Sequence, residues 1–143
     1  MNRRLITVFA LVGVLYAGTV FSQTAGNGPT TPLGTVTINQ PVMANGKPLP
    51  AGTYDVRLTA QNLTPLPGQA ADAERWVEFV ANGMVVGREV AVVMTPEAAP
   101  VGTGGQAART TSMKVELLKG GDFLRVSTYR DGTRYLIHMP ISH

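Results

Sequence analysis

The chain has 143 residues, with twelve Lys and Arg, nine Asp and Glu, two His and no Cys. This length allows one domain, and the lack of Cys excludes thiol catalysis, zinc–thiolate sites and disulfides, so an apolar core must supply the stability. Without Arg3 and Arg4 the net charge is about +1 and the other arginines are scattered, which argues against a nucleic-acid partner.

The first 22 residues have the layout of a secretory signal peptide. A basic start at Arg3 and Arg4 precedes an apolar run at 5–20, and the short side chain of Ser22 predicts cleavage before Gln23. An uncleaved anchor is the alternative, although the run is shorter than the ~20 apolar residues that span a membrane. We therefore expect a secreted or periplasmic bacterial protein with no stable membrane anchor after cleavage.

Residues 23–34 are rich in Gly, Pro, Thr and Asn and predict a flexible leader, followed by one domain at 35–143. In this domain apolar residues alternate with polar ones, as Val36 and Ile38 do, and a period of two residues predicts strands with one buried face. Eight strands are predicted, at 35–39, 42–44, 53–60, 75–81, 84–94, 112–119, 122–129 and 133–139.

Four dipeptides that tolerate the positive φ angles of tight turns separate these strands: Asn45-Gly46, Asn82-Gly83, Gly120-Gly121 and Asp131-Gly132. The last two turns set their registers independently, and both place Val126 on the same face, opposite Val115 on one side and Ile137 on the other. A slip of one residue would mix the two faces. The agreement therefore predicts a three-stranded meander at the end of the chain.

The hairpin at Asn82-Gly83 has two possible registers. Strict pairing would place Trp76 opposite Glu89, whereas a bulge at Gly87 would place Trp76 opposite Val90 and Glu78 opposite Arg88. We favour the bulge, because a glycine inside a strand often marks one.

Two long loops are predicted, at 61–73 and at 95–111. The low chemical variety of the second, which is rich in Pro, Ala and Gly, favours a linker or disorder over a functional loop. No segment after the signal peptide has a convincing helical period. The fold class predicted is all-β: a single small antiparallel β-sandwich, or a partly open barrel, of about seven or eight strands without significant helix.

The stretch 46-GKPLPAGTYDV-56 resembles the early strands of carboxypeptidase-regulatory-like domains, which are transthyretin-like sandwiches of bacterial surface proteins. Gly46, Leu49, Gly52, Tyr54 and Val56 match the spacing of that pattern. The resemblance implies a turn followed by a core strand whose Tyr54 and Val56 point inward. The segments at 48–54, 74–91 and 118–126 also resemble small uncharacterised secreted bacterial proteins, and this second resemblance implies no known activity.

Candidates for catalysis are few. His138 and His143 are the only histidines, and the predicted register places His138 beside Arg125, whose charge disfavours protonation of the imidazole. Glu116 would have to reach across Arg125 to orient His138 as a base. The acidic residues have no metal-binding spacing and the Gly-rich run at 102–105 lacks the Lys of a phosphate loop. We therefore expect no enzyme activity, no metal and no cofactor.

The outer face of the meander is the candidate binding face, because Tyr and Arg are the residue types that anchor interfaces. Tyr129 and Arg134 are expected to stack as a cation–π pair. The alternative is that the leader or the loop at 95–111 covers this face. The candidate residues are Phe123, Arg125, Tyr129, Arg134, Leu136 and His138.

Three functions are compatible with these features. The first is a non-catalytic binding or structural module at the cell envelope, with an envelope protein or a glycan as partner. The second is a self-assembling surface or filament subunit, in which the leader adds as a strand to a neighbouring sheet edge to form a homo-oligomer. The third, a small hydrolase, would need two carboxylates that converge in a cleft.

Overall fold

The computed structural model of the protein describes residues 28–95 and 113–143. The predicted signal peptide, residues 23–27 of the predicted leader and the predicted loop beyond Thr95 lie outside these residues. The described chain contains strands and turns but no helix, which confirms the all-β prediction.

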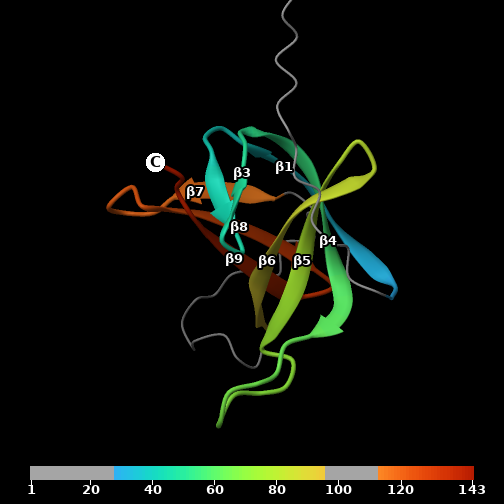
Figure 1. Ribbon diagram of the computed structural model, residues 1–143. Helices are drawn as coiled ribbons and strands as arrows, with labels where there is room; N and C mark the ends of the chain where they lie inside the picture. The colour runs from blue at the N-terminus through green and yellow to red at the C-terminus, as the bar shows by residue number, and fades with distance from the viewer. Residues whose placement is uncertain (1–27, 96–112) are drawn as a thin grey trace, which may run out of the picture.

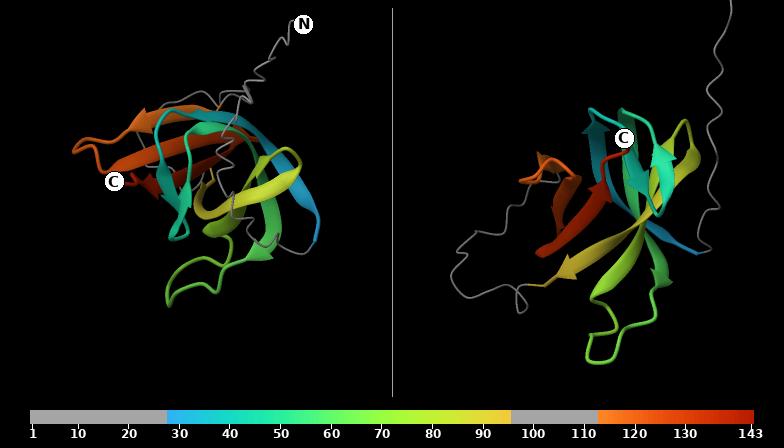
Figure 2. Two further views of the ribbon diagram at one scale, coloured as in Figure 1. Left: turned by 45° about the horizontal axis from the view of Figure 1, so that its top comes forward. Right: turned by 60° about the vertical axis from the view of Figure 1, so that its left-hand side comes forward.

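Seven of the nine strands form one curled antiparallel sheet, a half-barrel, in the order β1-β4-β5-β6-β9-β8-β7 (Figure 1). The other two form the hairpin β2–β3, which lies over the hollow side of the sheet (Figure 2). The partly open barrel is thus the form that the fold takes, with a two-stranded hairpin where a sandwich would have a second large sheet. The strands are β1 (Thr30–Ile38), β2 (Val42–Ala44), β3 (Lys47–Leu49), β4 (Gly52–Asn62), β5 (Glu74–Ala81), β6 (Met84–Met94), β7 (Lys114–Leu117), β8 (Phe123–Arg130) and β9 (Thr133–Pro140).

All four turn dipeptides have positive φ angles at both residues, and three of them form two-residue turns. Asn45, Asn82 and Asp131 have φ angles of 48°, 51° and 50°, and the glycine after each also has a positive φ. Two successive positive φ angles define the tight turn that suits the twist of a hairpin. Gly120 and Gly121, with φ angles of 105° and 78°, belong to a longer loop between Leu118 and Phe123, inside which the amide of Gly121 donates to the carbonyl of Leu118 at 3.0 Å.

The C-terminal meander has the predicted register. Val126 lies opposite Val115 on β7 and opposite Ile137 on β9, and both pairings extend along the strands as expected. Among the inward side chains of this meander, Val126 and Ile137 are fully buried, whereas Leu117 on the edge strand β7 is 57% exposed. The longer loop leaves the register intact, since Leu118 still pairs with Phe123 through a backbone hydrogen bond of 2.9 Å.

The bulge at Gly87 is also confirmed, with Trp76 opposite Val90 and Glu78 opposite Arg88. Its physical reason is a close approach of the hairpin β2–β3. A Cβ atom added at Gly87 would lie 3.2 Å from Cδ1 of Leu49 and 3.5 Å from Cβ of Ala44. A side chain at this position would press on Leu49, whereas its contact with Ala44 would be an ordinary van der Waals contact.

The predicted flexible leader is wrong for its last residues, because β1 begins at Thr30 and not at 35. Leu33 is fully buried in the core, and its carbonyl accepts a hydrogen bond from Oγ1 of Thr128 at 3.4 Å. The register of β1 against β4 shifts between Pro32 and Gly34. This irregularity hides the period of two residues in the sequence. The Pro- and Gly-rich composition then indicated a flexible segment where the chain forms a strand.

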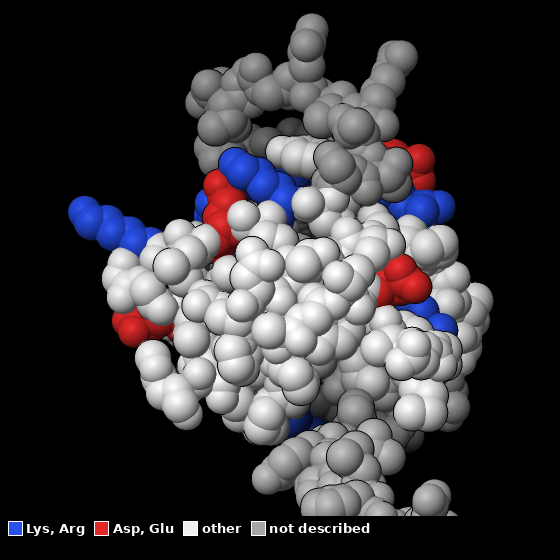
Figure 3. Space-filling view, turned by 90° about the horizontal axis from the view of Figure 1, so that it is seen from above, with Lys and Arg blue, Asp and Glu red and all other residues white. Residues whose placement is uncertain are grey.

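One end of the half-barrel carries little charge. The connections between β1 and β2 and between β3 and β4 lie at this end, and Figure 3 shows mostly uncharged side chains over its middle. The C-terminus is attached there as well, because Ile141 bridges to Val42 and the amide of Ser142 donates to the carbonyl of Pro41 at 3.0 Å.

Candidate functional site

The convex side of the curled sheet, called the outer face below, is formed by residues that point away from the core. One row of directly paired residues crosses five strands of this face. It consists of Glu74 on β5, Val92 on β6, Leu136 on β9, Ser127 on β8 and Lys114 on β7. Val92 is 38% exposed and Leu136 is half-buried. The middle of this row is thus an apolar strip, with one acidic residue at one end and one basic residue at the other.

All six residues of the predicted binding face lie on the outer face, on β8 or β9. Tyr129 lies opposite Arg134, and the guanidinium carbon of Arg134 is 5.6 Å from the centroid of the Tyr129 ring. This geometry confirms the predicted cation–π pair. Leu136 is next to this pair on β9. Phe123, which is 44% exposed, is six residues from Tyr129 along β8 and therefore about 20 Å away.

Arg125 connects Glu116 and His138, which lie opposite it on the two neighbouring strands. Nη2 of Arg125 donates to Glu116 at 2.9 Å, and Nζ of Lys114 is 2.7 Å from the other carboxylate oxygen. The hydrogen bond from Lys114, and next the one from Arg125, lower the pKa of Glu116. Partial burial, and then the charge of Arg125, lower the pKa of His138. Glu116 is therefore held by two cations instead of orienting His138 as a base.

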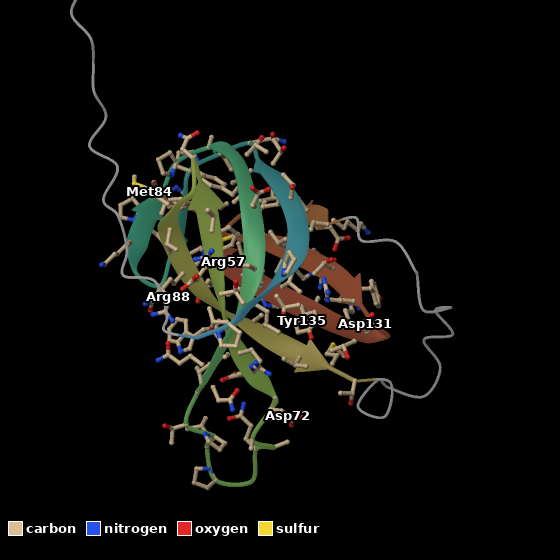
Figure 4. All side chains as sticks on the ribbon, turned by 90° about the vertical axis from the view of Figure 1, so that its right-hand side faces the viewer. Arg57, Asp72, Met84, Arg88, Asp131 and Tyr135 are labelled. Carbon is tan, nitrogen blue, oxygen red and sulfur yellow. The ribbon has the colours of Figure 1, made fainter. Side chains whose placement is uncertain are left out.

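A second cluster on the outer face was not among the predicted site residues. Glu78 of β5 lies opposite Arg57 of β4 and Arg88 of β6, and it has no exposed surface. Nε of Arg57 is 2.8 Å from one carboxylate oxygen of Glu78, and Nε of Arg88 is 3.7 Å from the other. Figure 4 labels Arg57 on β4 and Arg88 on β6, the two strands that flank β5 in this wall. The buried carboxylate thus holds two arginine side chains on the outer face.

Trp76, the only tryptophan of the chain, belongs to the same cluster. The guanidinium carbon of Arg88 lies 5.0 Å from the centroid of the Trp76 ring, and Nη2 of Arg88 donates to Oε1 of Gln61 at 2.7 Å. Arg88 is therefore held by a ring, a carboxylate and an amide. The bulged register predicted from the sequence already placed Glu78 opposite Arg88, so this part of the cluster could have been found from the sequence. The sequence did not show that Arg57 belongs to this cluster, because β4 and β5 are joined by a long loop and no turn dipeptide indicates their register.

The two arginine–aromatic pairs lie on the same surface. Arg88 is six residues from Met94 along β6, and Met94 lies opposite Arg134. At about 3.3 Å per residue, the Cα atoms of Arg88 and Arg134 are therefore separated by about 20 Å along the strands. Val92 and Leu136 lie between them. We call this surface the arginine–aromatic stripe; it consists of Trp76, Arg88, Val90, Val92, Leu136, Arg134 and Tyr129.

The stripe combines charged and apolar surface. Its arginines offer fixed N–H donors and its centre offers apolar contact area, which together suit an anionic ligand with an apolar backbone. Within residues 28–95 and 113–143, no three His, Asp or Glu residues are grouped so that they could hold a metal ion. A helix able to cross a membrane is likewise absent from that part of the chain.

Comparison with known proteins adds no further assignment. No family model, no curated protein and no solved structure matches this chain.

Proposed function

We propose that the protein is a non-catalytic binding module of the cell envelope, which holds its ligand on the outer face of the sheet. The observation that carries the proposal is the arginine–aromatic stripe. Arg88 and Arg134 are each placed over an aromatic ring, and an exposed apolar strip lies between them. Arg, Trp and Tyr are the residue types that dominate binding energy at interfaces. The envelope location rests on the expected signal peptide.

Preorganisation supports this reading. A long arginine side chain loses much conformational freedom when it binds a partner, and this loss weakens binding unless the side chain is already held in place. Glu78 and Trp76 hold Arg88, and Tyr129 holds Arg134. The conformational entropy of these side chains is therefore lost during folding and not on binding, so that ligand binding is more favourable.

Retention on an isolated envelope fraction tests the proposal. The secreted protein should sediment with washed envelopes at low ionic strength. Arg134→Ala removes a charge from the stripe and should reduce the retained amount. Lys47→Ala removes the same charge from the exposed hairpin β2–β3 and should leave retention unchanged. Absence of retention for the wild-type protein, or an equal loss in both variants, would contradict the proposal.

A self-assembling subunit is the second candidate. One observation favours it: within the described chain, β1 and β7 are the end strands of the half-barrel, and each has one hydrogen-bonded strand neighbour. Such edges can accept a strand from another copy. However, residues 30–34 of the expected leader are already part of β1. Light scattering after size exclusion separates the candidates, since a concentration-independent monomer rules out assembly.

A hydrolase finds less support. Glu78 and Glu116, the two carboxylates on the outer face with the best-defined contacts, are both paired with basic side chains. Glu78 is also fully buried, so a substrate would have to displace an arginine to reach it.

A further inference from the structure

The chemistry of the arginine–aromatic stripe points to one class of ligand. Resting on the function proposed above, we infer that the ligand is an acidic polysaccharide whose carboxylates bind Arg88 and Arg134. The contact between them would be made by sugar rings on Val92 and Leu136.

The charge of the stripe favours an anion. The whole outer face has five basic and four acidic residues, and one of the acids, Glu78, has no exposed surface. The basic residues are Arg57, Arg88, Lys114, Arg125 and Arg134, and the acidic ones are Asp55, Glu74, Glu78 and Glu116. The stripe itself contains two arginines, Arg88 and Arg134, and no acidic residue, so its charged groups attract a polyanion.

The distance between the two arginines along the sheet favours a polymer. About 20 Å separates Arg88 from Arg134 along the strands. A single small anion can reach only one of them. A chain that repeats its carboxylate groups can reach both, and binding at the second site is then intramolecular, which increases the overall affinity without any new contact.

The place of the stripe distinguishes a polysaccharide from an acidic peptide. An extended peptide usually joins a sheet at its edge, where free backbone groups provide hydrogen bonds. The stripe lies on β5, β6, β8 and β9, whose backbones are paired within the sheet. The outer face therefore offers only side chains. Guanidinium groups recognise carboxylates, and the apolar strip of Val92 and Leu136 can accept the C–H surface of sugar rings.

Calorimetric titration of the secreted protein with polygalacturonate at low salt tests this inference. Fully methyl-esterified polygalacturonate is the matched control ligand, because it has the same sugar chain without the charges. We expect binding of the acid form, at least tenfold weaker binding in Arg134→Gln, unchanged binding in Lys47→Gln, and no binding of the ester. Arg134 is the better test position, because replacing Arg88 also disturbs the buried Glu78.

Three results would overturn the inference: no binding of polygalacturonate, equal binding of poly-L-glutamate, or an equal loss in Lys47→Gln. Equal binding of poly-L-glutamate would mean that charge alone is recognised. Retention on envelopes that depends on Arg134, without polygalacturonate binding, would reject the polysaccharide and leave the binding function standing. Loss of both would reject the binding function as well.

Discussion

Nε of Arg57 donates a hydrogen bond of 2.8 Å to the carboxylate of Glu78, a residue with no exposed surface. This bond joins β4 to β5, and the carboxylate also faces Arg88 on β6. A buried carboxylate is stable only when it is paired, because burial removes its hydration. The outer face of the half-barrel is therefore held together by charge as well as by the sheet hydrogen bonds.

Glu78→Ala should lower the free energy of unfolding by about 3–5 kcal/mol, since it leaves two arginines without their shared partner. Urea unfolding followed by circular dichroism measures the loss. Glu116→Ala is the matched control, because it removes a carboxylate from a partly exposed ion pair on the same face and should cost less than about 1 kcal/mol. Equal losses would show that the buried pair has no special role.

Leu33→Ala should destabilise the protein by about 2–5 kcal/mol, because Leu33 is fully buried in the core. Leu66→Ala provides the control at a loop position that is 70% exposed, where a change within about 0.5 kcal/mol is expected. Thermal unfolding of both variants gives the comparison. If Leu33→Ala were as stable as the control, the start of β1 at Thr30 would be wrong.

Gly87→Ala should cost about 1–3 kcal/mol, because its new Cβ would press on Leu49. In a Leu49→Ala background the added cost should be smaller, since the truncated side chain leaves space. Urea unfolding of the two single variants and the double variant gives the coupling energy. Strict additivity would contradict the contact between the hairpin β2–β3 and the bulge.

Arg125→Met should raise the pKa values of both Glu116 and His138, because Arg125 contributes to lowering both. Glu116 should remain below its ordinary pKa, since Lys114 supplies the largest effect. NMR titration of both side chains measures the changes. Lys119→Met, at an exposed loop residue, is the control and should leave both pKa values unchanged.

The sign of the pH effect follows from the lowered pKa of Glu116. A carboxyl group whose pKa is lower in the folded state stabilises the fold above its unfolded pKa, and this contribution is lost as the pH falls through the folded pKa. The difference in stability between wild type and Glu116→Gln should therefore shrink on acidification. Added salt should reduce it as well, because this ion pair is partly exposed.

The C-terminal meander could be predicted from local sequence because its turns are short. Asp131-Gly132 determines a two-residue loop, and the alternation on each side then determines which residues face the core. The same local reasoning placed Arg134 over Tyr129. The bulge was equally predictable, since Gly87 interrupts an otherwise regular strand.

The beginning of β1 and the cluster around Glu78 could not be predicted in this way. The strand at Leu33 pairs with β4 across a register shift, and its proline resembles a loop residue. Arg57 is separated from Glu78 by the loop that joins β4 to β5, so no turn dipeptide indicates their pairing. Strand β3, which was not predicted, has only three residues and is too short to show a period.

The sequence by itself determined the all-β class, the turn dipeptides and the alternation of the last three strands, because positive φ angles and a period of two residues are local properties. Only the tertiary structure decided that the sheet curls into a half-barrel, that Leu33 fills its core and that Glu78 is buried between two arginines. These features depend on contacts between residues far apart in the chain, whose energies no short segment contains.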